Sequence, residues 1–104
     1  MSYIRVEVVR WVDAEWPGWM EVHLREADGS TATIVEKVPV LLWDELPATE
    51  LGLPAQIDIP CDVLEREQDV VGRAYALVRL RFRIEAQGGR NTFRLPGGDV
   101  TGSR

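Results

Sequence analysis

The chain has 104 residues, 45% of them hydrophobic and 28% charged, a balance that indicates one globular domain and excludes a disordered chain. Its 17 acidic and 12 basic residues give a net charge of −5, so duplex DNA is a poor partner, because that binding depends on neutralising phosphates. The sequence has no apolar run of membrane-spanning length, no secretory signal and a single cysteine. We therefore expect a cytoplasmic protein with no membrane partner.

Alternating apolar and polar residues predict two strands at the start of the chain. Between residues 3 and 8 every second side chain is apolar, and the pattern slips by one residue at Val8–Val9, as it does at a β-bulge. The alternation returns over residues 19–25 and gives this second strand three inward side chains: Met20, Val22 and Leu24.

The dipeptide Asp28–Gly29 lies between two alternating segments and predicts a tight hairpin. A third strand is predicted over residues 31–42, with Ala32 and Ile34 on its inward face. Pro39 removes a backbone donor from the second half of this strand, so we expect an edge or a bend there.

Residues 43–54 interrupt the alternation. Asp44 can begin a short helix and Pro47 ends it, so we expect a turn or two of helix. A fourth strand is predicted over residues 56–64, and Pro60 indicates that this strand also lies at an edge. A polar loop then turns the chain at Gly72.

The fifth predicted strand, over residues 76–85, has the longest regular alternation in the chain. Its predicted inward side chains are Ala76, Val78, Leu80, Phe82 and Ile84, and its outward side chains include Arg79, Arg81 and Arg83. The following segment, 86–104, contains five glycines, so we expect a flexible tail in which Phe93 and Leu95 dock locally.

These elements predict an all-β fold, in which residues 1–85 form one five-stranded antiparallel barrel with a short helical turn between strands three and four. Five curved strands with one buried face close most economically into a small barrel, and this order of elements matches the OB-fold plan. An SH3-like barrel and an open sheet that dimerises face to face are the alternatives.

Three stretches carry a resemblance to other proteins: residues 16–29, 34–40 and 59–64. Together they make residues 4–84 resemble a group of small β-rich proteins of high-GC bacteria that have no known activity. The resemblance implies a compact β domain and supplies no catalytic role.

The residues offer little for catalysis or for binding a metal. Cys61 falls on the inward face of its strand and His23 on the outward face of another, so a nucleophile and a base would lie on opposite sides of the sheet. One histidine and one cysteine are a poor basis for a zinc site. We expect no enzymatic activity, no catalytic residues, no metal and no cofactor.

The predicted function is therefore a non-catalytic interaction module that binds a protein partner or itself, as a weak homodimer. The candidate contact residues are apolar side chains in loops: Trp16, Trp43, Leu46, Leu51 and Leu53. The alternative is a small-ligand or single-stranded nucleic-acid binder that uses a barrel face, with Arg79, Arg81 and Arg83 as a basic stripe. The outward face of the predicted strand, which carries this stripe, has no aromatic residue for stacking, because Phe82 is predicted to point inward.

Overall fold

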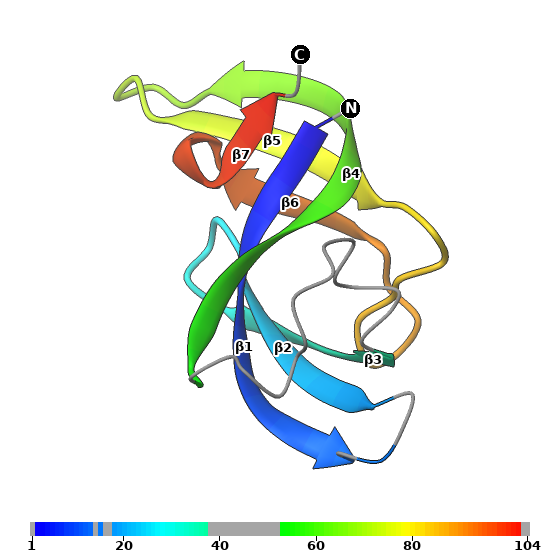
Figure 1. Cartoon of the computed structure of the whole chain (residues 1–104). Helices are drawn as coiled ribbons and strands as arrows, with labels where there is room; N and C mark the ends of the chain where they lie inside the picture. The colour runs from blue at the N-terminus through cyan, green and yellow to red at the C-terminus, as the bar shows by residue number, and fades with distance from the viewer. Residues whose placement is uncertain (1, 14, 16–17, 38–52, 103–104) are drawn as a thin grey trace.

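The computed structural model describes residues 2–13, 15, 18–37 and 53–102, and these residues form one antiparallel sheet (Figure 1). The elements in chain order are β1 (Ser2–Asp13), β2 (Trp19–Arg25), β3 (Thr31–Lys37), β4 (Ala55–Gln68), β5 (Ala74–Leu80), β6 (Thr92–Pro96), a 3-10 turn η2 (Gly97–Asp99) and β7 (Val100–Gly102). The all-β prediction is confirmed.

The sheet curls into a half-barrel in which the strands follow the order β3-β2-β1-β4-β5-β6. The long strand β1 makes this possible, because it pairs with different neighbours along its length. Residues 2–8 of β1 pair with β4, residues 7–13 pair with β2, and residues 2–4 also pair with β7. A register shift between Val8 and Arg10 confirms the predicted bulge, which increases the local twist of the strand.

The core lies on the inward face that the alternation predicts. Its largest fully buried side chains come from the six strands β1 to β6 and from the segment after β5: Ile4, Val8, Met20, Val22, Leu24, Ile34, Ile59, Val78, Ile84, Phe93 and Leu95. The predicted turn at Asp28–Gly29 is also present, with a φ of 89° at Gly29.

Three contacts join the β3 side of the curled sheet to β6 and to the segment that precedes it. Gln87 donates its backbone N–H to the carbonyl of Thr33 at 2.8 Å, and Ala27 donates to the carbonyl of Arg94 at 2.9 Å. The Arg90 guanidinium is also paired with Glu26 at 2.6 Å. The two ends of the sheet therefore approach each other through a turn and a loop.

The prediction that the fifth strand runs to residue 85 is wrong. Strand β5 ends at Leu80, and the chain turns at Phe82 and Arg83, which have φ angles of 59° and 61°. The alternation in the sequence continues through this turn because Ile84 re-enters the core after it, fully buried. Arg81 and Arg83 therefore do not share a strand face with Arg79.

The sequence predicts a flexible tail after residue 85, and the structure instead places two strands there. β6 pairs with β5 along its length, and β7 pairs with the start of β1. Phe93 and Leu95 are fully buried, which is a stronger contact than local docking. The prediction of five strands is therefore wrong, because the described residues form seven.

Pro60 does not mark an edge, since β4 lies between β1 and β5. It lies where β4 changes neighbours, opposite Tyr3 of β1, and its carbonyl accepts a hydrogen bond from the N–H of Arg81 at 3.4 Å. The predicted edge at Pro39 and the predicted helical turn lie outside the described residues. In the described part of the chain, no helix has the length and apolar character needed to cross a membrane.

Candidate interaction site

Strands β4 and β5 form a long hairpin whose loop, residues 69–73, lies at one extremity of the molecule (Figure 1). We call this loop the hairpin tip. Its backbone is closed by two hydrogen bonds of 3.0 Å, from the N–H of Asp69 to the carbonyl of Arg73 and from the N–H of Gly72 to the carbonyl of Asp69. Gly72 has a φ of 87°, the left-handed conformation that glycine adopts without steric cost.

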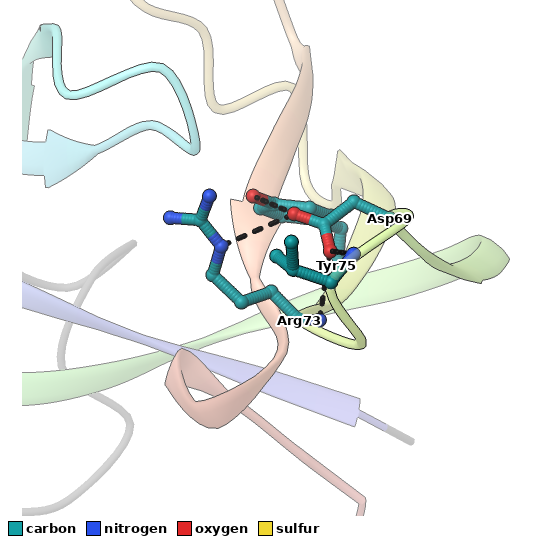
Figure 2. Close-up of polar contacts among 4 residues, drawn as sticks. Asp69, Arg73 and Tyr75 are labelled. Carbon is teal, nitrogen blue, oxygen red and sulfur yellow. Dashed lines mark hydrogen bonds and ion pairs between the residues drawn. The ribbon is translucent and has the colours of Figure 1, made fainter.

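The carboxylate of Asp69 organises the hairpin tip (Figure 2). It accepts the backbone N–H groups of Val71 and Arg73 at 2.9 Å, the Nε–H of Arg73 at 3.1 Å and the hydroxyl of Tyr75 at 3.2 Å. The bond from the Arg73 N–H is the main reason that the pKa of Asp69 lies below the ordinary aspartate value. One ionised side chain therefore fixes both sides of the loop.

Strand β6 supports the hairpin tip through Tyr75. The guanidinium of Arg94 lies 4.6 Å from the centre of the Tyr75 ring and also pairs with the carboxylate of Glu67 on β4. Arg94 thus connects β6 to both strands of the hairpin, and the Tyr75 hydroxyl extends this connection to Asp69. The segment that the sequence predicts to be a tail fixes the position of the tip.

The hairpin tip exposes two apolar side chains to water. Val70 is 104% exposed and Val71 is 70% exposed, the two largest values among the exposed hydrophobic residues of the described chain. Turn positions favour glycine, proline and small polar residues, and β-branched valines have no turn-forming role there. The signal that could have identified this site in the sequence is the pair of valines between a turn-forming Asp69 and Gly72.

The hairpin also leaves one backbone edge open. Residues 61–68 of β4 pair with β5, whereas β1 and β4 pair only as far as Cys61, so in the described part of the chain residues 62–68 have no strand on the other side. Leu64 lies within this edge and is 43% exposed. A register shift between Val63 and Glu65 interrupts the ladder, and the edge carries charged side chains, both of which deter unspecific pairing.

The opposite end of β5 has a second unusual turn. Phe82 and Arg83 both have left-handed φ angles, and the N–H of Ile84 donates to the carbonyl of Arg81 at 3.1 Å. This pattern is typical of a type I′ turn, which favours Asn-Gly. A non-glycine residue in this conformation costs roughly 1–2 kcal/mol. The turn leaves Phe82 47% exposed, with the guanidinium of Arg81 at 5.7 Å from its ring.

The predicted contact patch is described in part. Trp16, Trp43, Leu46 and Leu51 lie outside the described residues, so their role stays a prediction. Leu53 is half-buried and packs against the core. The basic stripe is split between β5 and the following turn, and Arg81 lies 3.7 Å from Asp62.

Cys61 is fully buried, as predicted, and burial raises the pKa of its thiol to about 11. His23 lies on the outer face of β2, where its Nε2 is 2.8 Å from the carboxylate of Glu21. Glu21 also accepts the Nε–H of Arg10 at 2.8 Å, and the His23 contact is the main reason that its pKa lies below the ordinary value. Within the described residues, no group of three or more His, Cys, Asp and Glu side chains could hold a metal ion.

A polar cleft of about 360 Å³ lies beside His23 on the outer face. It is lined by Arg5, Val6, Glu7, His23, Arg25, Thr31, Gln56 and Asp99. Two arginines and two carboxylates leave the lining without net charge when His23 is neutral. The cleft therefore favours neither an anionic nor a cationic ligand.

No protein-family model, no curated protein and no solved structure matches the chain. The resemblance to small proteins of high-GC bacteria stays an expectation. The features of the described chain that bear on function are the hairpin, its open edge, the polar cleft and the turn at the other end of β5.

Proposed function

We propose that the protein is a non-catalytic interaction module that binds a protein partner through the β4–β5 hairpin. The observation that carries the proposal is the exposure of Val70 and Val71 on a loop whose backbone is fixed by Asp69. A fixed loop loses little conformational entropy on binding, so an apolar anchor on it is favourable for affinity.

The two valines supply only part of the binding free energy. Full burial of a valine is worth about 1.5–3 kcal/mol, whereas association costs roughly 4–15 kcal/mol. The open edge at residues 62–68 can supply further contacts, because an added strand pairs with backbone N–H and C=O groups. The proposed partner therefore adds a strand along β4 and has an apolar pocket for the hairpin tip.

The charge of the open edge favours a different protein over a second copy. Residues 62–68 contain Asp62, Glu65 and Glu67 against the single basic residue Arg66. Two copies that paired along this edge would bring acidic side chains together, which is unfavourable. A partner strand with basic residues would be complementary, so homodimerisation is the less favoured form of the proposal.

The test compares three forms of the full chain as baits in a lysate of its source cells. The double variant Val70→Ser, Val71→Ser removes both anchors without touching the core, and Val12→Ser is the matched control, since Val12 is 45% exposed at the end of β1. We expect one protein to be captured by the wild type and the control and to be lost with the double variant. Binding is then repeated with the purified partner.

Two outcomes contradict the proposal. One is equal capture by all three forms, which would place the contact elsewhere, including on the predicted patch of Trp16, Trp43, Leu46 and Leu51. The other is the absence of any partner that depends on the two valines. A homodimer in solution that the double variant dissociates would assign the hairpin to self-association instead.

We also propose that the sheet follows the OB-fold plan. The support is the order β3-β2-β1-β4-β5 and the sharing of β1 between β2 and β4, which an SH3-like barrel does not need. In this plan β6 and β7 are additions to the five-stranded barrel. An experimental structure that pairs β1 with both β2 and β4 would support this assignment, and one in which β1 lacks either of these two partners would contradict it.

A further inference from the structure

The polar cleft on the outer face lies where β1 changes neighbours. On the side of β1 that faces away from β4, residues 2–4 pair with β7 and residues 7–13 pair with β2. The two residues between these stretches, Arg5 and Val6, therefore have no partner residue in either strand. β7 and β2 separate along this side of β1 (Figure 1), and the cleft of about 360 Å³ lies at the gap. Val6 lines the cleft although its side chain is buried in the core, so the main chain of β1 forms part of the wall.

The ends of the two separating strands bring opposite charges to the cleft. Arg25 is the last residue of β2, Asp99 directly precedes β7, and Glu7 is where the pairing of β1 with β2 begins. All three side chains line the cleft. In the described part of the chain no ion pair engages any of them, so the guanidinium of Arg25 is more than 4.0 Å from both carboxylates. One cation and two anions therefore share the cleft without neutralising one another.

The other charged side chains of the cleft already have partners. The guanidinium of Arg5 lies 3.8 Å from the carboxylate of Asp58, and the Nε2 atom of His23 lies 2.8 Å from the carboxylate of Glu21. A ligand with charge of only one sign would leave the unpaired charge of the other sign without a partner. A nucleotide is disfavoured for this reason, because its phosphates would lie against two carboxylates. The complementary ligand carries one charge of each sign.

We propose that the cleft binds a free α-amino acid, with the carboxylate of the ligand on Arg25 and its ammonium group on Glu7 and Asp99. A guanidinium binds a carboxylate through two parallel hydrogen bonds, and an ammonium group has three donors for carboxylate acceptors. The volume lies at the lower end of the range for small-molecule sites, which fits a ligand of this size. Thr31 and Gln56 add neutral hydrogen-bonding groups for a polar side chain of the ligand.

The test uses the ring of His23 as its probe. His23 is the only histidine of the chain and lines the cleft, so its ring proton signals in NMR report on this site without further assignment. Each of the common amino acids is added at constant pH and ionic strength, up to about 10 mM. The one that binds most tightly is then compared with its N-acetyl derivative, which keeps only the carboxylate, and its amide, which keeps only the ammonium group. Each derivative should bind about five-fold more weakly than the parent amino acid.

Two variants assign the two charges of the ligand. Arg25→Gln should weaken binding of the amino acid about five-fold and leave binding of the amide unchanged. Glu7→Gln should weaken binding of the amino acid and leave binding of the N-acetyl derivative unchanged. Both side chains are exposed, so the melting temperatures should stay the same. The matched control is Arg79→Gln, which removes an exposed arginine outside the cleft and should not change binding.

Three results would overturn the proposal. These are the absence of a saturable shift of the His23 signals with any amino acid, equal binding of the parent and both derivatives, and losses in Arg25→Gln and Glu7→Gln no larger than in Arg79→Gln. The Val70→Ser, Val71→Ser variant should keep its amino-acid binding, because no residue that lines the cleft belongs to the hairpin tip or to the open edge. Failure of this proposal therefore leaves the proposed protein partner unaffected.

Discussion

The two turns at the ends of β5 differ in how well their residues suit the backbone conformation. At the start of the strand, Gly72 takes the left-handed conformation and Asp69 accepts four hydrogen bonds, so the backbone of the hairpin tip has the residues that its geometry favours. At the end, Phe82 and Arg83 adopt the left-handed conformation without glycine. The first turn is unusual only in its exposed side chains, and the second is unusual in its backbone.

The two turns depart from what folding requires in two independent ways. In the hairpin tip the departure is apolar exposure, since Val70 and Val71 bury little of their surface. In the second turn it is conformational cost. Between the two turns, strand β6 pairs with residues 75–79 of β5.

The largest expected effect comes from weakening β6, the strand that pairs with β5 between the two turns. Phe93 on β6 is 1% exposed and lies opposite Val78 in the centre of β5. Phe93→Ala should lower the free energy of unfolding by about 3–5 kcal/mol, because it removes a buried ring and leaves a cavity. Urea denaturation measures this, with Leu64→Ala as an exposed control that should change stability by less than about 0.5 kcal/mol. A small loss for Phe93→Ala would mean that β6 is not part of the core.

A smaller effect of known sign is expected at Gly72. A Cβ added at this position would meet no atom within 4 Å, so Gly72→Ala has only the backbone cost of a φ of 87°. The variant should lose roughly 1–2 kcal/mol of stability in thermal denaturation. Replacing Phe82 and Arg83 by Asn and Gly should change stability in the opposite direction. If both changes moved the melting temperature the same way, the contrast between the two turns would be wrong.

The smallest expected effect is a pH dependence of the hairpin tip. Because the folded state lowers the pKa of Asp69, ionised Asp69 stabilises the fold at all pH values above its ordinary pKa of about 3.9. This contribution is lost as the pH falls through the lower folded-state pKa. The difference in denaturation midpoint between wild type and Asp69→Asn should therefore be constant near neutral pH and shrink below about pH 4. A difference that persists unchanged at lower pH would contradict the role of the carboxylate.

The sequence predicts the first half of the sheet well because each strand there has one buried face and one exposed face. The alternation identifies the buried residues Ile4, Val22 and Ile34, and Asp28–Gly29 identifies the turn between β2 and β3. The bulge at Val8 is visible in the sequence as a one-residue slip in the alternation, because the extra residue of a bulge also interrupts the alternation of side chains.

The second half is less predictable for identifiable reasons. Phe82 and Ile84 continue the period of two, and nothing in the pattern shows that left-handed residues replace an extended strand between them. Glycines at both ends of the β6 segment hide its short alternation of Phe93 and Leu95. The hairpin tip is not predicted because apolar residues in a sequence indicate burial, and exposure of Val70 can be seen only in three dimensions.

The pairing of β7 with β1 has a consequence for synthesis of the protein. Ser2, Tyr3 and Ile4 find their partners on β7 at Gly102, Thr101 and Val100, almost the whole chain later. At translation rates of 5–20 residues per second, these first residues wait on the order of ten seconds with one backbone edge unpaired. The pairing on this side of β1 therefore forms only after the residues of β7 have been synthesised.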